Sequence, residues 1–192
     1  MTKTENFDNV YIESAEQLRE WLEKHHEQTE SVWLVTYKKS TPEKYVSTSE
    51  VLDELLCFGW IDGIRRKLDL DRTMQLISPR KTQHWARTYK ERAAKLIESG
   101  RMHPTGLDAI EVSKKNGLWD FMNDVDNLVI PKDLAAGLAN YPNATEFFHA
   151  INDSSKRFVL RWLKLAKTEK TRANRIEKLA QLSAKGEKLK GS

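Results

Sequence analysis

The stretch from Leu55 to Arg80 constrains the fold more than any other part of this 192-residue chain. It holds the end of an apolar helical pattern, a glycine at position 59 and two strand-like runs. Glycine readily adopts the left-handed conformation that ends a helix, so the pattern predicts a helix ending at Gly59. The runs Trp60 to Lys67 and Thr73 to Ser78 predict a hairpin. Pro79 ends its second strand, because proline cannot donate a hydrogen bond to a sheet.

The segments before this stretch predict a body of mixed helices and strands. Ser31 to Lys38 has apolar and aromatic residues on both faces of an extended chain, as is typical of an interior strand. A shorter strand is expected at 10–12. Capping-box patterns at 14–17 and 47–50 each predict the start of a helix.

Beyond Arg80 every segment with a regular apolar period is helical. The fold class predicted is therefore α+β, with a small antiparallel sheet of three or four strands packed with helices and an all-helical C-terminal part. Residues 120–130 are acidic and lose the helical period, which indicates a connection. The expected organisation is a body at 1–119, this connection, a helical domain at 131–186 and a disordered tail at 187–192.

Several classes of protein are disfavoured by composition. No run approaches the roughly 18 apolar residues of a membrane span, and the N-terminal segment lacks the apolar region of a secretory signal. We therefore expect a cytoplasmic protein without membrane insertion. The single cysteine, Cys57, excludes an internal disulfide and a cysteine zinc cluster. His25 and His26 are adjacent and point to different helix faces, so no metal site or cofactor is predicted.

Positive charge is concentrated near the C-terminus. From Asp153 onward the chain carries twelve lysines and arginines against four acids, a surplus of eight, whereas the whole chain has a net charge of +4. Such a segment can attract nucleic acid, an acidic partner or an anionic membrane surface, but an ordinary solvated helix face is the favoured interpretation. The predicted basic face, if one helix runs through it, consists of Lys164, Lys167, Arg175 and Lys178.

Polar and aromatic residues gather at the predicted hairpin. Asp62 is suited to act as a general base, as an anchor for an amine or as an acceptor for turn amides. Arg65 and Arg80 are candidates to bind a carboxylate or phosphate, although each alone would be an ordinary surface residue. Trp60 and Trp85 are either pocket walls or core residues.

His84 is the one histidine near this cluster, and it is either a proton carrier or a residue at a helix start. Cys57 lies at a predicted helix C-terminus, where the dipole disfavours a thiolate, so a buried structural cysteine is favoured. No catalytic residue is assigned. The predicted site, for a small anionic ligand or a protein partner, comprises Trp60, Asp62, Arg65, Arg80, His84 and Trp85.

Four motifs resemble the YdeI/OmpD-associated family, also called bacteriocin-protection proteins. They are LCFGWIDG at 56–63, SPRK with HWAR at 78–87, ESGRMHPTG at 98–106 and KKNGLWD at 114–120. The segment at 154–176 is similar to the C-terminal domain of that family. Where members often have an arginine and a serine, this chain has Lys81 and His84.

The resemblance implies a cytoplasmic α+β body with a helical C-terminal part, linked to envelope stress and tolerance of antimicrobial peptides. It implies no reaction, cofactor or catalytic residue. Three hypotheses follow: a bacterial stress protein that binds a ligand or partner at the hairpin, a nucleic-acid-binding protein that uses the basic helices, and a small hydrolase or transferase that uses Asp62 and His84.

Overall fold

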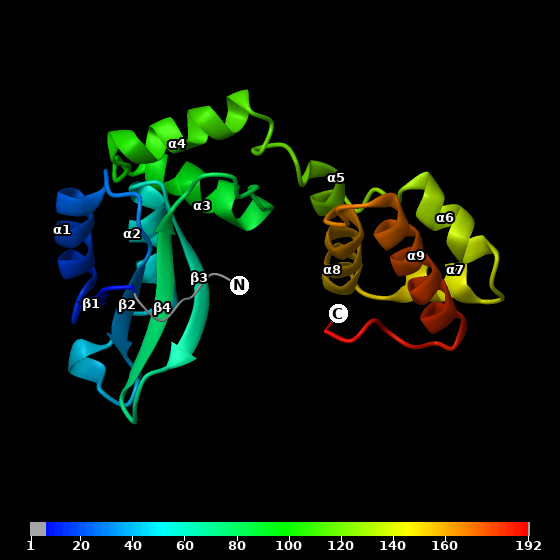
Figure 1. The fold of residues 1–192 in the computed structure, drawn as a ribbon, viewed down its shortest axis with the longest axis horizontal. Coiled ribbons are helices and arrows are strands. Elements are labelled where there is room, and N and C mark those ends of the chain that lie inside the picture. The colour runs from blue at the N-terminus through cyan, green and yellow to red at the C-terminus, as the bar shows by residue number, and fades with distance from the viewer. Residues whose placement is uncertain (1–6, 192) are drawn as a thin grey trace. The chain divides into compact units, whose positions relative to one another are not determined.

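The computed structural model describes residues 7–191, which form two compact units that divide after Asp120 (Figure 1). The first unit combines a sheet with helices, and the second contains helices only. The predicted α+β class with a helical C-terminal part is confirmed.

The sheet of the first unit has four strands in the order β1-β2-β4-β3. The predicted hairpin is present, with β3 (Trp60–Lys67) antiparallel to β4 (Arg72–Pro79). β2 (Val32–Tyr37) is antiparallel to β4 on its other side. However, the edge strand β1 (Asn9–Tyr11) runs parallel to β2, so the sheet is mixed rather than wholly antiparallel. The reason is the helix between β1 and β2, which carries the chain back to start β2 in the same direction.

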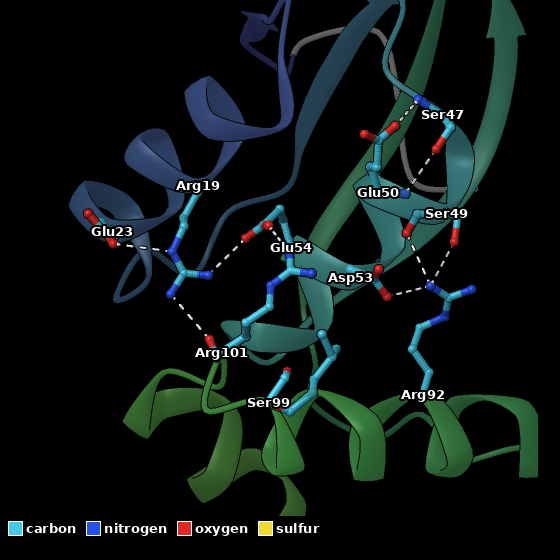
Figure 2. A network of polar contacts seen from close by, with 11 residues as sticks. Arg19, Glu23, Ser47, Ser49, Glu50, Asp53, Glu54, Arg92, Ser99 and Arg101 are labelled. Atoms are coloured by element: carbon cyan, nitrogen blue, oxygen red, sulfur yellow. Dashed lines mark hydrogen bonds and ion pairs between the residues drawn. The ribbon is translucent and has the colours of Figure 1, made fainter.

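Helices of this unit begin where the capping patterns predict. The Ser14 side chain accepts from the Gln17 amide, and Ser47 and Glu50 form a complete capping box (Figure 2). At each start, the serine side chain satisfies an amide that has no partner within the helix. The helices are α1 (Ala15–His25), α2 (Thr48–Cys57), α3 (Arg87–Glu98) and α4 (Pro104–Lys115), with a 3-10 turn, η1 (Pro42–Lys44).

The C-terminal end of α2 packs closely on the start of α4. Gly59 has a φ of +71° and turns the chain from α2 into β3, as predicted. The His103 amide donates to the Cys57 carbonyl at 3.0 Å. A Cβ atom at Gly106 would lie 2.2 Å from the same carbonyl oxygen. Only glycine therefore permits this separation between the two helices.

Three helical segments are joined by a buried carboxylate (Figure 2). Glu54 of α2 is only 3% exposed and accepts hydrogen bonds from Arg19 of α1, at 3.0 Å, and from Arg101, which follows α3. Arg19 also donates to the carbonyl of Arg101 at 3.2 Å. A buried charge is costly unless it is paired, and here two guanidinium groups provide the pairing.

The second unit packs its helices around a core of its own, which includes Leu134, Phe148, Leu160 and Leu179. Arg172 binds the Asp133 carboxylate through two nitrogens, at 2.5 and 2.9 Å. Its helices are α5 (Asn123–Asp126), α6 (Lys132–Ala139), α7 (Ala144–Ala150), α8 (Asp153–Lys164) and α9 (Glu169–Ala184).

Two segments at the edges of this unit differ from expectation. Residues 120–130, expected to be a connection, contain α5 and bury Met122 and Val125 in the core. In the tail, expected to be disordered from residue 187, Leu189 is 7% exposed and belongs to the same core. Single apolar residues within a polar segment do not form a helical or strand pattern. No sequence pattern therefore predicts that they are buried. Residue 192 lies outside the described part.

We expect the second unit to become less stable in acid, because protonation of Asp133 removes its ion pair with Arg172. Arg172 lowers the pKa of Asp133. The stabilisation that the ion pair gives is therefore fully present above the pKa of Asp133 in the unfolded chain, about 4. It is lost as the pH falls through the lower pKa of Asp133 in the folded chain. Urea midpoints measured at several pH values through the indole resonance of Trp162 should decline less steeply for Asp133→Asn. Parallel curves for the two proteins would contradict this.

Candidate functional site

Arg80 is held at the junction of the hairpin and α3. Its amide donates to the Gly59 carbonyl at 2.8 Å. Its guanidinium carbon lies 4.0 Å from the centroid of the Trp85 ring and 5.6 Å from that of Tyr89, and Nη1 donates to the Gln83 carbonyl at 3.3 Å. Burial lowers the pKa of Arg80 to about 10. The guanidinium thus packs against aromatic rings, and this interaction offsets only part of the cost of removing the charge from water.

The charge of Arg80 has no direct counterion in the described part of the chain. No carboxylate oxygen of residues 7–191 lies within 4.0 Å of its nitrogens, and Nε is buried without a hydrogen-bond partner. Asp62 is near enough to oppose the lowering of the Arg80 pKa, but burial dominates. A buried cation without a partner is unfavourable, so an anion next to Arg80 would be stabilised.

Asp62 joins the hairpin to α3. One carboxylate oxygen accepts from the Tyr89 hydroxyl at 2.5 Å, and the other accepts from the Gln75 amide at 3.1 Å. Gln75 in turn accepts from Arg65 at 2.7 Å, and Arg65 also donates to Thr48 at 3.2 Å. Burial and the bond to Asp62 raise the pKa of Tyr89. Asp62 therefore lies in a strand and not in a turn, where it accepts hydrogen bonds that connect β4 and α3. Arg65 binds Gln75 and Thr48 and does not take part with Arg80 in one site.

A pocket of about 230 Å³ lies between the hairpin ends and α4. Trp60 is 1% exposed, and its indole N–H is buried without a hydrogen-bond partner, as is that of Trp85. Both indole nitrogens are closed to solvent, so a ligand in the pocket would contact the Trp60 ring and not its N–H group. Residues that line the pocket include Trp60, Arg80, Lys81, Thr105, Asp108 and His26.

The structure brings only some residues of the predicted site to the pocket. Trp60 and Arg80 border the pocket, whereas Trp85 supports Arg80 from the core. His84 is half-buried in the loop between β4 and α3, does not line the pocket and lies three residues before α3 begins at Arg87. Sequence reasoning missed Tyr89 and Gln75 as members of the polar cluster. Tyr89 follows Trp85 by four residues, a spacing that would place both on one face of a helix, and this was the sequence feature that pointed to Tyr89.

The residues of the predicted basic face do not lie on one helix. The helix does not run through it, because the chain leaves α8 after Lys164 and α9 starts at Glu169, capped by Thr168. Lys164 is bound to Asp124 at 2.5 Å. Arg175 lies 4.8 Å from the centroid of the Trp162 ring. Lys167 lies in the connecting loop, and Lys178 lies on α9.

Within residues 7–191, no group of three or more His, Cys, Asp or Glu side chains is placed to hold a metal. Cys57 is fully buried, and burial raises the pKa of its thiol. A buried thiol with a raised pKa is a poor nucleophile, so the structural interpretation of this cysteine is supported.

Comparisons with known proteins found two family models. Residues 10–109 match the model described as Domain of unknown function (DUF8412), and residues 127–186 match the one described as Bacteriocin-protection, YdeI or OmpD-Associated. Searches of the curated proteins and of the solved structures found no match. None of the helices described is long and apolar enough to cross a membrane.

Proposed function

The chain belongs to the family of that domain of unknown function, and its residues 127–186 match the bacteriocin-protection, YdeI or OmpD-associated family. We propose that its first unit binds a small anionic ligand beside Arg80. The observation that carries this proposal is the partly buried guanidinium without a counterion in the described residues. An anion would supply that counterion.

The pocket next to Arg80 offers donors of the right kind. Besides the Arg80 guanidinium, the Lys81 side chain lines the pocket and adds a second cation. A hydrogen bond to a charged group contributes about 1.5–3 kcal/mol, roughly twice a neutral one. The volume of about 230 Å³ is below the range of drug-sized sites, about 300–1,000 Å³, so a small carboxylate or phosphate is favoured.

We further propose that this binding takes place in the cytoplasm and contributes to tolerance of bacteriocins or related stress. The name of the matched family supports the second part of this proposal. The buried free thiol of Cys57 is compatible with a reducing compartment. Fractionation of cells that express the chain would test the location, and recovery outside the cytoplasm would contradict it.

Removal of the Arg80 charge should weaken anion binding at least tenfold. Arg80→Met keeps an apolar stem against Trp85, and the matched variant Arg65→Met removes a hairpin cation that does not line the pocket. Titrations with acetate, benzoate and inorganic phosphate at constant ionic strength would be followed through the indole N–H resonance of Trp60. At least one probe should shift this resonance in the wild type and in Arg65→Met, but much less in Arg80→Met.

Two results would overturn the proposal. One is that none of the three anions shifts the Trp60 resonance in the wild type. The other is that the shift is equally weakened in Arg65→Met and Arg80→Met, which would indicate a general effect of net charge. Thermal denaturation of each variant without ligand shows whether the fold is retained.

A further inference from the structure

A second pocket, of about 510 Å³, lies between α2 and α3, and neither Trp60 nor Arg80 lines it. We name it the α2–α3 groove. Figure 2 shows Arg92 on one side and Ser99 with Arg101 on the other, with Asp53 between them. Residues that line the groove include Ser49, Asp53, Thr88, Arg92, Lys95 and Arg101.

The two arginines of the groove are fixed in place but retain unused donors. Nη1 of Arg92 donates to the carbonyl and the hydroxyl of Ser49, at 3.1 Å each, and pairs with Asp53. Nη2 of Arg101 binds Glu54. In the described chain, Nε and Nη2 of Arg92 and Nε and Nη1 of Arg101 make no hydrogen bond. Both guanidinium groups are therefore preorganised, with donors left for a ligand.

Lys95 adds a third cation one helical turn from Arg92. It is exposed and has no ion pair among residues 7–191. Residues three apart on a helix share a face, so both side chains border the same groove. The acids that line the groove are Asp53, which is paired with Arg92, and Glu91. Arg92 and Arg101 are paired with Asp53 and Glu54, so Lys95 is the lining cation that has no ion pair in the described residues.

Hydroxyl groups complete the lining. Thr88 lies near the N-terminal end of α3, and Ser99 follows its C-terminal end. The Ser99 hydroxyl donates to the Leu96 carbonyl at 3.2 Å, so its lone pairs remain available as acceptors. The Thr88 hydroxyl lies one helical turn from Arg92, so this end of the groove suits a ligand that has an anionic group and hydroxyls of its own.

From this arrangement we propose that the α2–α3 groove binds a phosphomonoester carried on a small hydroxyl-bearing molecule. A phosphate has three terminal oxygens, so it can accept at once from the Arg92 guanidinium and the Lys95 ammonium, which lie one helical turn apart, and still has an oxygen left, whereas a carboxylate has two oxygens. The hydroxyl-bearing part would lie toward Thr88 and Glu91. The site is independent of the one beside Arg80.

The test is an amide NMR titration with glycerol 3-phosphate, inorganic phosphate and glycerol, at constant ionic strength. Glycerol 3-phosphate should shift the amides of Thr88 and Lys95, inorganic phosphate should do so more weakly, and glycerol should not. Lys95→Ala should raise the Kd for glycerol 3-phosphate about tenfold, the effect expected for one charge-assisted hydrogen bond, while Lys95→Arg retains binding.

The matched control is Lys115→Ala, which removes an exposed lysine near the end of α4, outside the groove. The Kd should not change in this variant or in Arg80→Met, so failure here is distinct from failure of the site beside Arg80. Equal loss of affinity in Lys95→Ala and Lys115→Ala would overturn the proposal. An absence of groove shifts in the wild type would overturn it as well.

Discussion

Glu54→Leu is expected to destabilise the first unit by about 3 kcal/mol, because it leaves two arginines without their shared carboxylate. Removal of one partner from a buried ion pair costs about 3–5 kcal/mol. The side chains of Arg19 and Arg101 are 33% and 44% exposed and can turn toward water, which places the expected value at the lower end. The urea midpoint, read by tryptophan fluorescence, measures the loss.

Glu23→Leu is the matched control for this prediction. Glu23 also pairs with Arg19, at 3.6 Å, but its side chain is 52% exposed. Exposed ion pairs contribute about 0–1 kcal/mol, so the urea midpoint of this variant should barely move. Similar losses in the two variants would show that burial of Glu54 is not the source of the effect.

Gly106→Ala is expected to destabilise the chain by about 3 kcal/mol or more, although alanine normally favours a helix by about 1 kcal/mol over glycine. The added Cβ would lie 2.2 Å from the Cys57 carbonyl oxygen and 2.8 Å from its carbon. These are backbone atoms at the end of α2, so a helix must shift. The thermal midpoint and the urea midpoint should both fall, and the Trp60 resonance should move, since Thr105 lines the same pocket.

Gly100→Ala separates this clash from a general effect of losing a glycine. Gly100 has a φ of +70°, and a Cβ there would meet nothing within 4 Å. Only backbone strain of about 1 kcal/mol is expected. A Gly106→Ala protein at least as stable as the wild type would show that α4 does not approach α2 as closely as the structure places it.

Part of the candidate site could be predicted from sequence, because the hairpin places its own residues. Trp60 and Arg80 lie at opposite ends of adjacent strands, so a correct hairpin brings both to the same edge, and both line one pocket. The hairpin alone does not show that Asp62, which lies on the same strand as Trp60, is outside the pocket. Asp62 is bound by Tyr89, 27 residues away, and that contact depends on how α3 packs against the sheet.

Local chemistry in the sequence determined the features that depend on neighbouring residues. The serine N-caps, the left-handed Gly59 and the hairpin all follow from hydrogen bonds and chain geometry within a few residues. Tertiary structure alone decided the parallel pairing of β1 and the burial of Glu54. The two arginines that pair with Glu54 are 35 and 47 residues away in the chain. Such contacts form only when separate elements pack together, and no local pattern encodes them.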